Sequence, residues 1–284
     1  MPSVFETRSR VKFTREEGLF LLCTRFAWPT RLKTMEFLFG YGASSISEAV
    51  NWVLYFIDNH WNFLLNDFTS GHLSTTRLLE FAKKVRAKGA PLDCCWGFID
   101  CTIRQICRPK KWQQDCYNGY KHLHALKYSA VKCPDGLIYH VFGPYEGRRN
   151  DNALLRESEL LARRREFAPS FYLYGDPAYP LSSVLISPFS HLTGELSESQ
   201  KIFNKRMSSC REAVEWGFAD VVRLWTSLDF KSTQRVFTSP VGCQYRVAVI
   251  LTNIHICLYG SETSLYFNCS PPTLSQYLVS PHCI

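Results

Sequence analysis

The sequence lacks the features that mark several common protein classes. No apolar run reaches the roughly 18 residues of a membrane-spanning helix, and the first ten residues, MPSVFETRSR, are too polar for a secretory signal. Glycine (15) and proline (14) are not enriched among the 284 residues, which argues against a disordered or fibrous chain. The 12 cysteines form no CxxC pair, so we expect reduced, mostly buried thiols.

The sequence does have enough apolar material for a sizeable core. Hydrophobic residues make up 46% of the chain and aromatic residues 14%. The length is sufficient for one large domain or two smaller ones. A net charge of +8 permits binding to a polyanion without establishing it.

Residues 1–90 are predicted to form a helical region. Helices are expected at Thr14–Phe26, which starts with a capping-box pattern, and at Arg31–Leu38, Ser45–Leu65 and Thr75–Lys88. A Gly-containing turn precedes the third of these, as in a helix-turn-helix. The alternative is an ordinary helical hairpin, because the third helix has many core-type residues.

A strand-rich region follows the segment Gly89-Ala90-Pro91. We expect an α/β domain over residues 91–260, an RNase H-like mixed sheet flanked by helices, and then a loosely docked tail at 261–284. The expected strands are Trp96–Ile106, Ala125–Cys133, Leu137–Phe142, Phe171–Tyr174 and Val184–Ile186; the expected helices are Asn152–Glu166, one from Ser208 or Ser209 to Leu228, and Val241–Tyr259.

Asp100 stands in the middle of the first apolar strand, WGFIDCTI. Strand interiors are depleted in Asp, and burying an unpaired carboxylate costs several kcal/mol. A buried basic partner, a polar network or a bound cation must therefore compensate for the charge of Asp100.

Two further carboxylates are placed where an RNase H-like sheet would bring them near Asp100. Asp176 directly follows the fourth strand, and Glu215 lies beside the apolar stripe of the long helix, with Arg211 four residues before it. Each has a simpler explanation, a turn residue for Asp176 and a helix ion pair for Glu215. Three converging carboxylates repel one another, and Mg²⁺ or Mn²⁺ would remove that repulsion.

The sequence over residues 92–230 closely resembles the DDE-type endonuclease domain of PIF/Harbinger transposases and the genes derived from them. The matching segments are GFIDCT (97–102), YNGYK (117–121), GPYEGRRND (143–151), LYGDPAYP (173–180) and FNKRMSSCREAVE (203–215). The resemblance implies that Asp100, Asp176 and Glu215 form a catalytic triad that binds two divalent ions and cuts DNA at transposon ends. The Arg-x3-Glu spacing favours Glu215 over Glu212.

Two positions depart from the family pattern. A Lys is usual seven residues after the Glu, and here that position is Val222, with Arg223 beside it. The family often has His before the Asp of the GRRxD segment, where this chain has Asn150. Asp151 is a candidate to support the triad from outside it, as is Arg211, although a helix N-cap is the simplest explanation for Asp151.

Basic residues near the predicted site are candidates to bind DNA phosphates, and each is equally explained as a solvated surface charge. They are Lys110, Lys111, Lys121, Arg148, Arg149 and Arg223.

We therefore expect a metal-dependent DNA-cutting nuclease. We expect it in the nucleus, or in the cytoplasm when it has no partner. Expected partners are double-stranded DNA, a Myb-like DNA-binding protein that the resemblance implies, and a second copy of the chain; no membrane is expected. The main alternative is a domesticated, catalytically silent derivative that binds DNA or protein. Because Met1 is close to the first helix, the sequence leaves open whether a segment precedes it.

Overall fold

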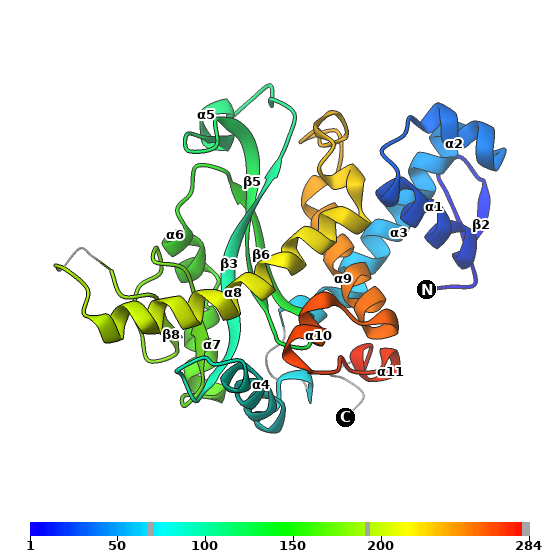
Figure 1. Ribbon diagram of the computed structural model, residues 1–284. Helices are drawn as coiled ribbons and strands as arrows, with labels where there is room; N and C mark the ends of the chain where they lie inside the picture. The colour runs from blue at the N-terminus through cyan, green and yellow to red at the C-terminus, as the bar shows by residue number, and fades with distance from the viewer. Residues whose placement is uncertain (67–70, 191–193, 280–284) are drawn as a thin grey trace.

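A six-stranded mixed sheet runs through the centre of the molecule (Figure 1). It is seen in a computed structural model that describes all residues except 67–70, 191–193 and 280–284. The strands of this sheet are β3 (Cys95–Gln105), β4 (Tyr117–Asn118), β5 (Leu123–Lys132), β6 (Ile138–Glu146), β7 (Tyr172–Tyr174) and β8 (Leu185–Ile186).

Five strands lie in the order β6-β5-β3-β7-β8. The sixth, β4, is paired with the start of β5. β5 is antiparallel to both β3 and β6, whereas β7 is parallel to β3 and to β8. This topology is the RNase H-like arrangement that the sequence predicts. β5 and β6 form a hairpin, and β7, the fourth predicted strand, runs parallel to β3, the first.

The two faces of the sheet carry different side chains and different helices. On β3, Asp100 and Thr102 share a face with Tyr128 of β5, whose ring lies 4.3 Å from that of Tyr245 in α9. Lys127 of β5 belongs to the opposite face and pairs with the first residue of α6. The helices of this part are α4 (Thr75–Ala87), α5 (Gln113–Cys116), α6 (Asp151–Glu157), α7 (Leu160–Phe167), α8 (Glu198–Leu224) and α9 (Val241–Tyr259).

Several helix boundaries differ from the prediction; the predicted Ser45–Leu65 helix, for example, ends at Trp61. α8 begins at Glu198, about ten residues before the predicted start, because Ser197 and Gln200 form a capping box there, and it ends at Leu224 instead of Leu228. The predicted helix over 152–166 is divided into α6 and α7 at Glu159, whose backbone is left-handed with φ of 54°.

The N-terminal region contains three predicted helices and one unpredicted hairpin. The helices are α1 (Arg15–Ala27), which has the predicted Thr14 capping box, α2 (Leu32–Phe39) and α3 (Ala43–Trp61). Two short strands, β1 (Val4–Glu6) and β2 (Lys12–Thr14), precede them. α3 packs on α9, and Arg246 of α9 donates two hydrogen bonds to Asp58 of α3, at 2.8 and 2.6 Å.

The C-terminal segment is docked and not loose, up to the last described residue, 279. It contains α10 (Glu262–Phe267) and α11 (Leu274–Tyr277). The Tyr277 ring is fully buried, and its hydroxyl accepts a hydrogen bond from Asn253 of α9 at 2.9 Å. Apolar contacts and this buried hydrogen bond explain the docking; residues 280–284 lie outside the described part.

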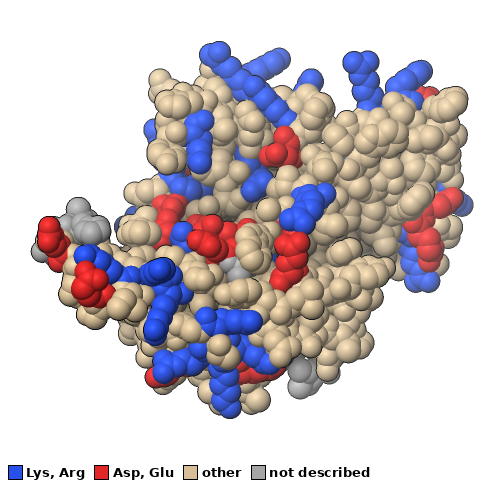
Figure 2. All heavy atoms as spheres, in the orientation of Figure 1, with Lys and Arg blue, Asp and Glu red and all other residues tan. Residues whose placement is uncertain are grey.

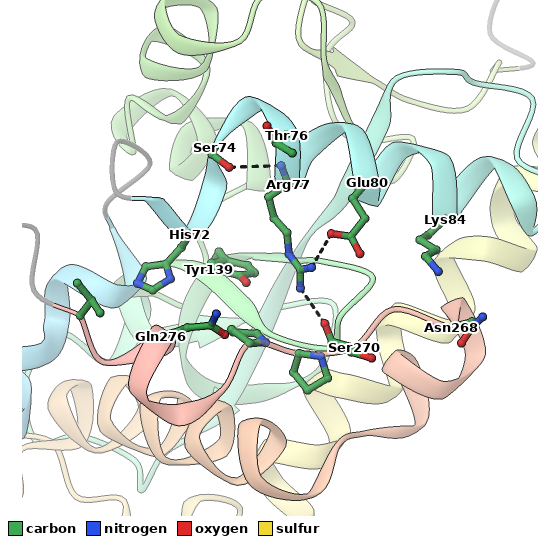
Figure 3. A pocket seen from close by; sticks show the side chains of 13 residues that line it. His72, Ser74, Thr76, Arg77, Glu80, Lys84, Tyr139, Asn268, Ser270 and Gln276 are labelled. Carbon is green, nitrogen blue, oxygen red and sulfur yellow. Dashed lines mark hydrogen bonds and ion pairs between the residues drawn. The ribbon is translucent and has the colours of Figure 1, made fainter.

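A cavity of about 710 Å³ lies between α4 and this C-terminal segment (Figure 3). Arg77 crosses it and is fully engaged, by Glu80 at 2.6 Å, by the buried Asp135 at 3.1 Å and by the Ser270 carbonyl at 2.8 Å. None of the three predicted catalytic carboxylates lines the cavity. Its arginine ties the C-terminal segment to α4.

α9 is long and apolar enough to cross a membrane, by length and composition alone. This differs from the sequence expectation that no run reaches that length. In the structure 56% of its apolar window is buried inside the protein. Core helices of soluble proteins pass the same test, so the criterion is weak evidence here.

Candidate active site

Asp100 lies in the middle of β3 and is half-buried. The backbone N–H of Cys101 donates to its Oδ1 at 2.8 Å. Burial raises the pKa of Asp100 to about 6, and the nearby carboxylates of Asp176 and Glu215 add to this rise, against the opposing effect of Arg211. The first predicted catalytic residue is thus a carboxylate whose charge is poorly compensated within the protein.

The parallel pairing of β3 with β7 brings Asp176 close to Asp100. Phe98 of β3 is paired with Tyr174 of β7. Asp100 and Asp176 each follow two residues later, so the parallel register sets them level with each other. Glycine at 175 leaves room for the Tyr179 ring, which would lie 2.5 Å from a Cβ there. Burial also raises the pKa of Asp176, while the Ala178 N–H donates to its Oδ1 at 3.0 Å.

Glu215 reaches the same region from α8. Its side chain is 43% exposed and forms an ion pair with Arg211 at 2.9 Å. After burial and Asp176, Glu215 also raises the pKa of Asp100. This electrostatic coupling favours Glu215 as the third carboxylate, in agreement with the sequence argument.

Arg211 is the cation that faces all three carboxylates. Besides pairing with Glu215, it lowers the pKa of both Asp100 and Asp176. Sequence reasoning gives Arg211 only the Glu215 contact, because i,i+4 spacing says nothing about residues on other elements.

Asp151 is not the helix N-cap that its position suggests. Asn150 caps α6 instead, accepting the Ala153 N–H at 2.8 Å. Asp151 forms an ion pair with Lys127 and raises the pKa of Asp176. Asp151 thus acts electrostatically on Asp176 and is held by a salt bridge to Lys127 on the α6 face of the sheet; its supporting role stays a prediction.

Sequence reasoning missed Lys127 and Tyr179. Lys127 donates to the Arg149 carbonyl at 3.0 Å in addition to pairing with Asp151, and the Tyr179 hydroxyl lies 3.3 Å from Cys101 Sγ. The signal available for Lys127 was a lysine within a predicted strand, where its charge needs a partner, as does that of the aspartate in β3.

The basic residues predicted to bind DNA fall into two groups. Lys110, Lys111 and Lys121 are exposed at the end of the sheet where α5 lies, and none forms an ion pair within the described chain. Each arginine is instead paired with carboxylates. Arg148 contacts Asp115 at 2.7 Å, Arg149 contacts Glu146 at 3.1 Å and also Glu157, and Arg223 contacts Asp220 at 3.5 Å and Glu262 at 3.8 Å.

Arg223 does not take the place of the lysine that the family pattern has at position 222. Its contact to Glu262 directs it toward α10. Val222 itself is half-buried. Two helical turns after Glu215 on the same face of α8, at position 222, there is consequently no basic side chain.

The carboxylates fit a divalent cation by their chemistry. Within residues 1–66, 71–190 and 194–279, no three His, Cys, Asp or Glu side chains are close enough together to hold a metal ion in the conformation seen. The donors are nevertheless hard carboxylate oxygens, which Mg²⁺ and Mn²⁺ prefer. The raised pKa of Asp100 indicates that added positive charge would be favourable beside it.

Comparison with known proteins agrees with this arrangement. No curated protein and no solved structure matches the chain significantly. The DDE superfamily endonuclease family matches residues 99–253, which is more than half of the 284 residues and includes Asp100, Asp176 and Glu215. The chain belongs to the DDE superfamily endonuclease family.

Proposed function

We propose that this chain is a divalent-metal-dependent DNA endonuclease of the DDE transposase type, which hydrolyses phosphodiester bonds at transposon ends. The observation that carries the proposal is the coupling of three carboxylates from three elements. The β3–β7 register sets Asp176 level with Asp100, and Glu215 of α8 helps to raise the pKa of Asp100.

In this proposal Asp100, Asp176 and Glu215 would hold two Mg²⁺ or Mn²⁺ ions. Such ions lower the pKa of the attacking water and stabilise the leaving oxygen. Arg211 would orient Glu215 through their 2.9 Å contact and limit repulsion among the carboxylates before metal binds. The Lys127–Asp151 pair would hold α6 against the sheet next to Asp176.

The proposed substrate is double-stranded DNA, bound in the nucleus. Charge supports this choice: the net charge is +8, and Figure 2 shows acidic side chains near the centre of one face with basic side chains above and below them. We further propose a Myb-like DNA-binding protein, which the family resemblance implies, and a second copy of the chain as partners.

The test is nicking of supercoiled plasmid DNA with and without Mn²⁺. Wild type should nick only with Mn²⁺, and Asp100→Asn should not nick. Asp229→Asn, which changes an exposed carboxylate, is the matched control and should nick like wild type. Equal nicking by Asp100→Asn and wild type would overturn the proposal.

A second candidate function is a catalytically silent derivative that binds DNA or protein. Val222 in place of the usual lysine favours it, as does the absence of a ready-made metal cluster among the described residues. Calorimetric titration with Mn²⁺ separates the two candidates. A site that is lost in Asp176→Ala supports the nuclease, whereas no binding by wild type supports the silent derivative.

A further inference from the structure

A structured element projects from one end of the sheet and carries exposed aromatic and basic side chains. It consists of residues 106–124, which connect β3 to β5 and include α5 and β4, together with residues 231–238; we call it the arm (Figure 1). The two segments are joined by the Cys107 N–H, which donates to the Gln234 carbonyl at 2.8 Å. Within the arm, Ile106 and Cys116 pack with Val241 in a small hydrophobic cluster of their own. The arm is thus a packed element of the fold.

Two aromatic rings stand exposed side by side on the arm. Trp112 and Phe237 come from its two segments, are 61% and 63% exposed, and have ring centroids 5.3 Å apart. Rings of this size are usually buried. Here each leaves a large apolar face open to a ligand.

The backbone beneath both rings is strained. Trp112 has φ of 53° and Phe237 has φ of 73°, the left-handed region that side-chain-bearing residues rarely adopt. Such strain persists only where the surrounding structure enforces it, and it is concentrated at ligand-binding sites. The left-handed backbone at Trp112 and Phe237 thus costs energy. Because the two rings are exposed, burial in the core does not account for that cost.

The charge around the rings has one sign. Six exposed cations on the arm form no ion pair within the described residues: Arg108, Lys110, Lys111, Lys121, Lys231 and Arg235. Its one carboxylate, Asp115, is paired with Arg148 at 2.7 Å. Figure 2 shows basic side chains projecting at this end of the molecule.

We propose that the arm binds an unpaired stretch of DNA strand, with bases stacked on Trp112 and Phe237 and phosphates on the surrounding cations. Exposed rings among cations are how single strands are held without sequence preference. A duplex offers phosphates to the same cations but no ring faces, because its bases are stacked within it. The inference rests on the proposed function for the identity of the nucleic acid.

The position of the arm suggests which strand it holds. β3 leads from Asp100 to Ile106, six residues on, at the base of the arm, a distance of about 20 Å for an extended strand. A strand that leaves the carboxylates along β3 would reach the base of the arm after about six nucleotides, at about 3.4 Å per stacked base. The arm would then hold the strand that becomes unpaired beside the cut.

Binding is tested without cleavage, in EDTA, by fluorescence anisotropy. The probes are an oligothymidylate of about 20 nucleotides, longer than a typical single-strand site, and a blunt hairpin duplex with the same number of phosphates. Wild type should prefer the single strand. Trp112→Gly, which suits the left-handed backbone and so should keep the fold, should weaken single-strand binding about tenfold and leave duplex binding nearly unchanged.

Two variants complete the design. Trp112→Tyr keeps a ring and should restore most of the affinity, and Trp28→Ala removes a 49% exposed tryptophan elsewhere and should change nothing. Unchanged affinity in Trp112→Gly would overturn the inference, as would no single-strand binding by wild type, which is the result expected if the arm contacts a protein. Binding is measured in EDTA and requires no cleavage, so a failed nicking assay leaves this result interpretable.

Discussion

The ammonium group of Lys132 occupies the space that a side chain on Gly217 would need. A Cβ at Gly217 would lie 1.1 Å from Lys132 Nζ. Lys132 is fully buried on β5, and Nζ has no hydrogen-bond partner among the described residues. The lysine thus reaches α8 two residues after Glu215 and sets how closely that helix approaches the sheet.

Gly217→Ala should destabilise the protein by about 1–3 kcal/mol, the usual cost of overpacking. Urea unfolding would measure the change. Gly119→Ala is the matched control, because nothing lies within 4 Å of a Cβ there. If Lys132 is the obstacle, the double variant Gly217→Ala/Lys132→Ala should show a smaller loss than the sum of the two single losses; strict additivity would contradict the proposed contact.

Lys132→Met should stabilise the protein near pH 7. Burial lowers the pKa of Lys132 to about 8, so the folded state binds fewer protons than the unfolded state between about pH 8 and 10. Wild-type stability should therefore rise with pH through this window, and the methionine variant should lack that rise. Urea unfolding at pH 7 and pH 9.5 checks both points. A parallel pH response in the two proteins would contradict the prediction.

Asp100→Asn should stabilise the metal-free protein by about 3 kcal/mol at pH 7.5. The pKa of Asp100 is raised to about 6 from 3.8, so the folded state binds more protons and wild type loses stability as the pH rises from about 4 through 6. Unfolding in EDTA at pH 4.5 and 7.5 measures this loss. Asp229→Asn, at an exposed position, should behave like wild type. An Asn variant less stable than wild type at pH 7.5 would mean that the carboxylate is structural.

Glu215→Gln and Glu212→Gln form a matched pair on α8. Glu215 raises the pKa of Asp100 and pairs with Arg211, whereas Glu212 forms no ion pair among the described residues. We expect Glu215→Gln to lower Mn²⁺-dependent nicking by about 100-fold or more, since a loss near 100-fold already follows when only a supporting residue of a metal site is removed. Glu212→Gln should change it little. The reverse ranking would assign the third carboxylate to Glu212.

Arg211→Met should move the acidic limb of the pH–rate profile to higher pH. Arg211 lowers the pKa of Asp100 and Asp176, so without it both carboxylates stay protonated to a higher pH. Nicking rates measured between pH 5 and 9 would show the shift. Arg206→Met, an exposed arginine on the same helix, is the control. A lower rate with an unshifted profile would mean that Arg211 acts only on helix packing.

Several parts of this structure could be predicted from sequence because they depend on local patterns. The strand order follows from apolar runs between turn signals, and Asp100 is conspicuous because an aspartate is out of place in such a run. The early start of α8 was missed because its first turns are polar and exposed, although the Ser197 capping box marks the boundary.

The remaining parts depend on contacts between distant segments. Lys127 and Lys132 lie on opposite faces of β5, and no alternation in a strand buried on both faces distinguishes them. The effect of Arg211 on two strands, and the pairing of Arg223 away from the site, arise from how α8 crosses the sheet. Sequence spacing along one helix contains no information about that crossing.

Glu215 lies on a single long helix, and this determines where insertions and deletions in the chain can be tolerated. α8 runs from Glu198 to Leu224 without interruption, and each added residue turns a helix by about 100°. An insertion before Ser197 leaves the direction of Glu215 unchanged. One residue inserted between Arg211 and Glu215 would turn the carboxylate away from Asp100 and place another side chain beside it. Relatives of this chain should therefore differ in length ahead of α8 and keep a constant length within its second half.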